Sequence, residues 1–177
     1  MVPVSDYAMV GESASLKEAL VALENEQRSY KDGPYRHQSL VVVDDKQHVV
    51  GRVSQIDIMR ALEPRYKNVG DHRNLGGLAG LTSRMLATMR EEFQLWERPV
   101  ESLPGVIAGL KVADVMQTPS EGEFVKESDT MNIAMHRIVM GQHHSLLVTR
   151  DQDKVIVGIL RSTDVFNALY DMISISQ

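Results

Sequence analysis

Two short stretches of the chain place a carboxylate three residues after a polar side chain, at a predicted junction between a strand and a helix. The first, Gly51–Asp57, contains Ser54 and Asp57, and the second, Gly158–Asp164, contains Arg161 and Asp164. A carboxylate only accepts hydrogen bonds, so it suits a vicinal diol, which offers two donors. The free N–H groups at the start of a helix also suit an anion. These junctions are therefore the candidate binding elements for a polar small molecule.

Both junctions belong to a longer internal repeat. Upstream of them, Ser39–Asp44 corresponds to Ser145–Arg150, and Ser15–Leu20 corresponds to Thr130–Met135. Three matched blocks in the same order indicate two copies of one unit, with a period of about one hundred residues, which is too long for a solenoid. We therefore predict an α/β (α+β) protein whose two pseudo-symmetric units each read strand–helix–strand–strand–helix.

Helix and turn signals position the elements of each unit. Ser15 and Glu18 form a capping-box pattern before an apolar stripe at helical spacing, and Pro64 should end the helix that follows Asp57 at about Leu62. The predicted segments of the first unit are a helix to about Gln27, a turn at Asp32–Pro34, and strands Leu40–Val43 and His48–Val53. Those of the second unit are a strand at Phe124–Val125, a helix from Thr130 to about Gly141, strands Ser145–Val148 and Val155–Leu160, and a helix Thr163–Ile173.

A different kind of sequence separates the units. The segment Lys67–Gly80 is rich in glycine and mixed charges, which predicts a connector. After it, one helix is predicted to carry Met85, Leu86, Met89, Phe93 and Trp96 on an apolar face, which should pack on the repeats or on another subunit. The predicted division is residues 1–66, an insertion at 67–111, and residues 112–177.

Composition excludes several classes of function. The net charge of −5 is spread along the chain, which argues against non-specific nucleic-acid binding. The sequence has no cysteine, which excludes disulfides, thiolate metal sites and cysteine nucleophiles. No apolar run reaches the ~20 residues needed to span a bilayer, and the N-terminus lacks the layout of a signal peptide. We expect a cytoplasmic protein that does not act at a membrane.

The repeated unit resembles the cystathionine-β-synthase (CBS) domain, which occurs in tandem as a Bateman module. The typical unit ends Gly-apolar-apolar-Thr/Ser-x-x-Asp before a helix. The first copy fits at Gly51, Val53, Ser54 and Asp57, and the second at Gly158, Ile159, Leu160 and Asp164. Arg161 stands where the hydroxyl residue belongs. The resemblance covers roughly residues 5–66 and 112–175 and leaves out the insertion.

The resemblance implies a regulatory module that senses an adenosine compound (AMP, ADP, ATP or S-adenosylmethionine) in clefts between the units. The family's aspartate accepts hydrogen bonds from the ribose, its hydroxyl residue contacts phosphate, and the first strand reads adenine. The implied ligand-binding residues are Tyr7, Ala8, Ser54 and Asp57 in one cleft, and Phe124, Val125, Arg161, Thr163 and Asp164 in the other. It also implies energy sensing, a homodimer, a separate effector protein, and neither catalytic chemistry nor a covalent cofactor.

Several alternatives stay open at this stage. Ser54 and Asp57 also form a capping box, although capping alone could use Ser162 in the second copy and would not need Asp164. Arg161 is either an ordinary exposed arginine, a residue that damages the phosphate contact, or one whose guanidinium replaces it. The function could also be purely structural dimerisation without a ligand, or, less favoured, an enzymatic reaction on a nucleotide.

Histidines supply the remaining candidate for chemistry. His136, His143 and His144 could suggest a metal site, but adjacent side chains on a strand point to opposite faces. No carboxylates join them at a convincing spacing, so a surface or cleft-edge position is favoured.

Overall fold

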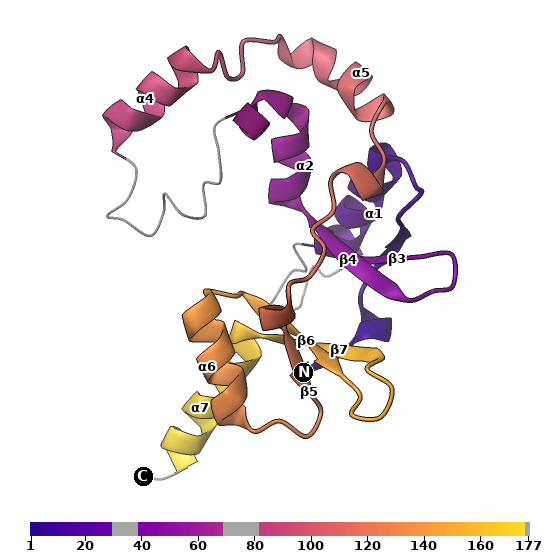
Figure 1. Cartoon of the computed structure of the whole chain (residues 1–177), viewed down its shortest axis with the longest axis vertical. Helices are drawn as coiled ribbons and strands as arrows, with labels where there is room; N and C mark the ends of the chain where they lie inside the picture. Colours follow the sequence, from indigo (N-terminus) through magenta and orange to yellow (C-terminus); the bar gives the residue numbers. More distant parts are fainter. Residues whose placement is uncertain (30–38, 69–81, 176–177) are drawn as a thin grey trace.

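The computed structural model describes residues 1–29, 39–68 and 82–175, and these residues form two packed units with a helical insertion (Figure 1). One sheet has the strand order β2-β3-β4, and the other has the order β1-β7-β6-β5. The predicted α/β class with two repeated units is confirmed. The predicted turn at Asp32–Pro34 and most of the connector after Lys67 lie outside the described residues.

The first unit consists of β2 (Met9–Gly11), α1 (Leu16–Ser29), β3 (Ser39–Val43), β4 (Val49–Ser54) and α2 (Gln55–Leu62). Helix α1 begins with the predicted capping box, in which Ser15 N–H donates to Glu18 Oε2 at 2.7 Å and Glu18 N–H donates to Ser15 Oγ at 3.2 Å. Strand β2 runs parallel to β3, and β3 runs antiparallel to β4. The apolar stripe of α1, including the fully buried Leu16, packs on this sheet.

The second unit repeats this order with β5 (Phe124–Lys126), α6 (Met131–Gly141), β6 (Ser145–Thr149), β7 (Ile156–Arg161) and α7 (Ser162–Ile175). Strand pairing is again parallel for β5 and β6 and antiparallel for β6 and β7. In both hairpins the register of strand pairing shifts at the corresponding position, between Val42 and Val43 and between Val148 and Thr149. The internal repeat seen in the sequence is therefore a structural repeat.

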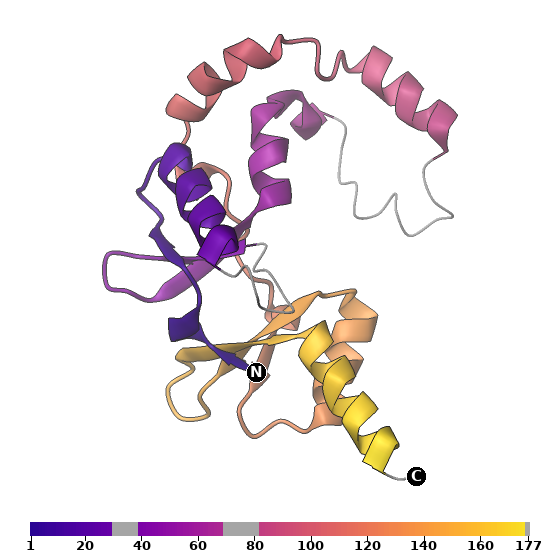
Figure 2. The ribbon, with the colours of Figure 1, turned by 180° about the vertical axis from the view of Figure 1, so that it is seen from behind.

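The N-terminal strand β1 (Val2–Pro3) crosses from the first unit and pairs antiparallel with β7 of the second. Between the two sheets lies a cluster of buried residues formed by Tyr7, Val41, Val43 and Ile159. Both units contribute to this cluster, so the two sheets share one apolar interface, and the N-terminus lies beside the second unit (Figures 1 and 2).

The insertion contains α4 (Ser83–Glu92) and α5 (Leu103–Ala108), which arch over the end of α2 (Figure 2). The prediction of one helix carrying Met85 through Trp96 is wrong, because α4 ends at Glu92 and Trp96 has a left-handed φ of 59°. Met85 and Leu86 are 47% and 51% exposed, so about half of each side chain is open to solvent.

Hydrogen bonds join Trp96, which follows α4, to the residues that follow α2. Trp96 N–H donates to Glu63 Oε2 at 2.8 Å, and Trp96 Nε1 donates to the Tyr66 hydroxyl at 2.9 Å. The guanidinium of Arg65 donates to both oxygens of the buried Glu63 carboxylate, and these hydrogen bonds lower the pKa of Glu63 to about 2. This ionised cluster compensates for burying a carboxylate.

Within the described ranges, no helix combines the length and the apolar character that a membrane crossing requires.

Candidate functional site

At the first junction, Ser54 ends β4 and caps α2. Its extended backbone (φ −107°, ψ 168°) turns the chain into the helix, and its hydroxyl accepts a hydrogen bond from Asp57 N–H at 3.3 Å. In return, Ser54 N–H donates to Asp57 Oδ2 at 2.9 Å. The two predicted site residues therefore form the reciprocal capping box that a hydroxyl residue and an acidic residue at this spacing favour.

The second carboxylate oxygen of Asp57 faces the chain that leads into the second unit. The side-chain amide of Gln117 donates to Asp57 Oδ1, and an Arg60 nitrogen lies 3.5 Å from the same oxygen. Asp57 is only 3% exposed. One oxygen thus serves the helix cap, while the other holds partners that a ligand hydroxyl could replace.

Asp57 lines a cavity of about 150 Å³. Its walls come from the end of α2 and from the chain after α5, including Arg60, Tyr66, Leu110 and Val115. Ligand clefts usually measure roughly 300–1,000 Å³. This cavity is smaller than that range, and of the residues implied for the first cleft only Asp57 lines it.

At the second junction, Arg161 and Asp164 pair with each other. Arg161 N–H donates to Asp164 Oδ2 at 3.0 Å, and Arg161 Nε lies 3.1 Å from both carboxylate oxygens. Partial burial acts to raise the pKa of Asp164, but the hydrogen bonds and charge of Arg161 outweigh it, so the pKa is lowered overall. Arg161 thus occupies the carboxylate on which the resemblance places the ribose.

The same contacts give Asp164 a role in capping α7. The expectation that capping alone could use Ser162 and would not need Asp164 is therefore wrong. Helix α7 instead begins at Ser162, and the Asp164 carboxylate accepts a hydrogen bond from the N–H of Arg161, the residue before the helix. Asp164 therefore has the same local capping function as Asp57, and its presence in both copies does not by itself distinguish binding from capping.

Arg52 of β4, in the first unit, contacts two residues of the second unit or its leading segment. Its guanidinium donates to Ser145 Oγ at 3.1 Å and pairs with Glu123 Oε2 at 3.0 Å. Ser145 is the strand partner of Arg161, so Arg52 contacts the residue that lies beside Arg161 in the second sheet. Sequence reasoning singled out neither Arg52 nor Gln117, because each acquires its role only from contacts with the other unit or its leading segment.

The other predicted site residues have structural contacts of their own. Tyr7 is 7% exposed in the cluster between the sheets, and the Ala8 carbonyl accepts from Val41 N–H at 3.1 Å. The Phe124 carbonyl accepts from Arg137, and Val125 belongs to the core of the second unit. Thr163 is half-buried in the first turn of α7.

Among the described residues, no three His, Asp or Glu side chains are grouped so that they could hold a metal ion. Of the candidate histidines, His144 uses its carbonyl to accept from Ser162 N–H at 2.9 Å, beside the start of α7.

Comparison with solved structures finds the same fold in several proteins. A CBS-pair protein from Arabidopsis thaliana, CBSX2, aligns with a TM-score of 0.60 and 22% identity over 98% of this chain and 93% of its own. CBSX2 in complex with AMP aligns with a TM-score of 0.57 and 20% identity over 97% and 93% of the two chains. A CBS domain-containing protein from Bacillus anthracis aligns with a TM-score of 0.57 and 18% identity over 97% and 89%.

No curated protein matches the sequence. The family model of the CBS domain matches residues 2–64 and 112–171, which together make up more than half of the chain. The chain therefore belongs to the CBS domain family and carries the domain in tandem.

Proposed function

We propose that this protein is a regulatory module that binds an adenosine nucleotide between its two CBS units and responds by a change of conformation or assembly. The observation that carries the proposal is the environment of Asp57: a buried carboxylate that keeps one oxygen on displaceable partners, one of them from the segment that leads into the second unit. A ribose diol offers the donors that this oxygen needs. AMP bound to the similarly folded CBSX2 supports an adenosine compound as the ligand.

The first cleft is proposed to use Ser54 and Asp57 with the backbone near Tyr7 and Ala8. The second would use Asp164 and Thr163 with Phe124 and Val125. Arg161 holds the Asp164 carboxylate, so we propose that it reduces ribose binding in the second cleft. Arg52, half-buried between the units, is an additional candidate for contacting phosphate, because its Glu123 partner can be exchanged for another anion.

Signalling would follow from the same contacts. A ribose that takes Asp57 Oδ1 releases Gln117, whose backbone N–H and carbonyl are bonded to Arg52 at 2.8 and 3.0 Å. Arg52 in turn contacts Ser145 and Glu123 of the other unit. A ligand shifts an equilibrium only by its unequal affinity for two states, and the states proposed here differ in whether Gln117 is bonded to Asp57.

We also propose a homodimer formed through the helices that follow the two junctions. One side of α7 exposes large apolar side chains, namely Phe166 (68%), Tyr170 (64%) and Ile173 (66%), and α2 exposes Ile56 (55%) and Met59 (49%). Apolar surface of this kind on a small protein is typical of an interaction site.

The remaining parts of the proposal concern organisation and context. The division into residues 1–66, 67–111 and 112–177 stays a prediction, as do cytoplasmic location, energy sensing and a separate effector protein. Two alternatives compete with the sensing role: a dimerisation module that binds no ligand, and an enzyme acting on a nucleotide.

A thermal-shift panel of AMP, ADP, ATP, S-adenosylmethionine and adenosine, with and without Mg²⁺, tests the proposal. Sensing predicts that at least one compound raises the melting temperature, with guanosine nucleotides as the control. A panel without any shift supports the purely structural module. Turnover of ATP above background would support the enzyme.

A further inference from the structure

A groove of about 500 Å³ lies between α1 and α2 of the first unit. It is lined by Leu23 and Ile58, which are buried, and by Leu20 and Met59, which are 40% and 49% exposed. The described part of the chain therefore leaves an apolar surface open between these two helices.

Polar side chains flank this apolar surface. Gln55 Nε2 of α2 donates to Gln27 Oε1 of α1 at 3.2 Å, and both residues line the groove. Arg28 pairs with Glu24 along α1 at 2.7 Å. An apolar centre with a polar rim is the usual composition of a protein–protein interface. Aromatic side chains, and tyrosine in particular with its polar tip, have the properties that such a groove requires.

The second unit presents exposed aromatic side chains at the equivalent place. The repeat places Phe166 of α7 where the first unit has Met59, and Tyr170 where it has Glu63. Phe166, Tyr170 and Ile173 follow one side of α7 at helical spacing and are 68%, 64% and 66% exposed. These three residues are called the α7 ridge.

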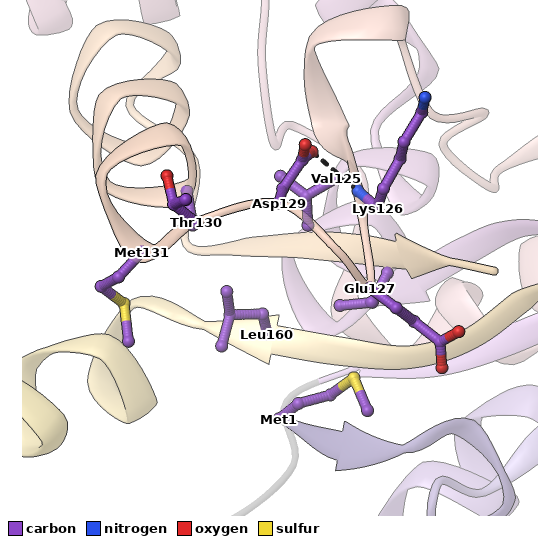
Figure 3. Close-up of a pocket in the computed structure, with 10 residues that line it drawn as sticks. Met1, Val125, Lys126, Glu127, Asp129, Thr130, Met131 and Leu160 are labelled. Carbon is purple, nitrogen blue, oxygen red and sulfur yellow. Dashed lines mark hydrogen bonds between the residues drawn. The ribbon is translucent and has the colours of Figure 1, made fainter. Parts of the chain in front are cut away.

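The insertion accounts for the difference between the two units. Glu63 is only 1% exposed, because Trp96 N–H and the guanidinium of Arg65 hold its carboxylate at the end of α2. Among the described residues, none covers Tyr170 in this way. The cavity of about 400 Å³ in the second unit is elsewhere, between the start of α6 and Leu160 of β7 (Figure 3).

We propose that the α7 ridge of a second copy of this chain occupies the groove between α1 and α2, so that the dimer is head-to-tail. The ridge cannot fill the groove of its own chain, because both sheets lie between α1 and α7 (Figures 1 and 2). A two-fold axis places each ridge in the groove of the other copy and closes the assembly at two copies. Helices α2 and α7 lie on the same side of the strands, as this arrangement requires (Figures 1 and 2). The inference rests on the homodimer of the proposed function.

Shape and size favour this pairing. A dimer that joined like units would set groove against groove, and the apolar base of each groove would stay open. In the head-to-tail dimer, Phe166 supplies an apolar ring for the base and Tyr170 a hydroxyl for the polar rim. The exposed parts of these aromatic side chains and the surfaces that cover them would bury about 800–1,300 Å² in the dimer. That area reaches the ~1,200 Å² at which stable interfaces begin.

The test is cysteine cross-linking of the full chain, which contains no cysteine of its own. Gln55→Cys marks the groove and Asn167→Cys marks the ridge, and both positions are exposed. The double variant, treated with a short bismaleimide, should form a covalent dimer, and neither single variant should. Self-cross-linking of either single variant overturns the head-to-tail pairing in favour of like units. A dimeric double variant that does not cross-link overturns it as well.

Two controls separate the possible failures. The double variant Gln152→Cys/Asn167→Cys, with one cysteine on an exposed turn, should not cross-link, which excludes chance collision. Light scattering of the wild type that gives a monomer mass overturns both the homodimer and this pairing, whereas a dimer whose cross-links join like units overturns this pairing alone. Thermal shifts with AMP are read on the same samples, so the nucleotide-binding part of the proposed function is judged independently.

Discussion

The side-chain amide of Gln117 donates a hydrogen bond to the carboxylate of Asp57, which joins the segment that leads into the second unit to the helix cap of the first. Asp57 is 3% exposed and cannot exchange this partner for bulk water without a local opening. A ligand bound at Asp57, as proposed, would therefore act on the connection between the two units.

Replacing Gln117 with alanine should tighten AMP binding in the first cleft by about 10-fold. The ribose no longer has to displace a hydrogen bond to a charged group, which is worth roughly 1.5–3 kcal/mol. Calorimetry with AMP measures the effect, and Gln152→Ala, at an exposed turn position, is the control. Weaker or unchanged binding in Gln117→Ala would show that this residue does not compete with the ligand.

The Asp57→Ala variant separates binding from capping. Loss of the cap should cost about 0.5–2 kcal/mol of stability, and loss of the ribose contact should lower AMP affinity about 10- to 150-fold, which removes measurable binding if the affinity is micromolar. Glu18→Ala breaks the same kind of capping box at α1 and is the matched control. It should lose similar stability but keep AMP binding. Equal AMP affinity in Asp57→Ala and wild type, with folding intact, would leave only capping.

Substitution of Arg161 by threonine should strengthen AMP binding in the second cleft, because it frees the Asp164 carboxylate and restores a hydroxyl. Asp164→Ala should act on that cleft alone. The control is Arg150→Thr, which breaks an exposed Arg–Asp pair of the same i,i+3 spacing with Asp153. If Arg161→Thr instead weakens ATP more than adenosine, the guanidinium replaces the hydroxyl as a phosphate ligand.

Stability should fall in acid partly through Glu63. Its pKa is depressed from 4.5 to about 2 by Arg65, so its contribution is fully present above pH 4.5 and is lost as the pH falls towards 2. The decrease in unfolding free energy between pH 6 and pH 3 should be about 2 kcal/mol smaller in Glu63→Gln than in wild type. Urea denaturation at both pH values measures it, and the 62%-exposed Glu97, replaced by Gln, is the control. An identical acid loss in Glu63→Gln would contradict the assignment.

Assembly can be tested on α7. The double variant Phe166→Asp/Tyr170→Asp should be monomeric in light scattering at tens of micromolar, where wild type should give a dimer mass, since charges at a buried apolar interface are costly. Val100→Asp, at a 73%-exposed position of the insertion, should stay dimeric. A monomeric wild-type protein would exclude the dimer.

Most of the fold could be predicted from the sequence, because its elements are set by interactions between residues close together in the chain. The Ser15–Glu18 cap, the Ser54–Asp57 cap and the end of α2 before Pro64 are set by residues within four positions of one another, so they could be predicted. The repeat predicted the second unit from the first. Helix α4 was predicted too long, because the apolar spacing continues to Trp96 while the backbone of Trp96 takes a left-handed φ and its N–H bonds Glu63 instead.

Only the tertiary structure decides which side chains bind the carboxylates of the candidate site. Gln117 reaches Asp57 from sixty positions away, and Arg52 reaches Ser145 across the two units, and neither contact has a local signal. The sequence showed Arg161 as a departure from its family's pattern, but only the folded junction pairs it with Asp164 and makes that carboxylate both a cap and an ion pair. Pairing between distant side chains depends on how the sheets pack, and the periodicity of a single strand or helix does not contain that information.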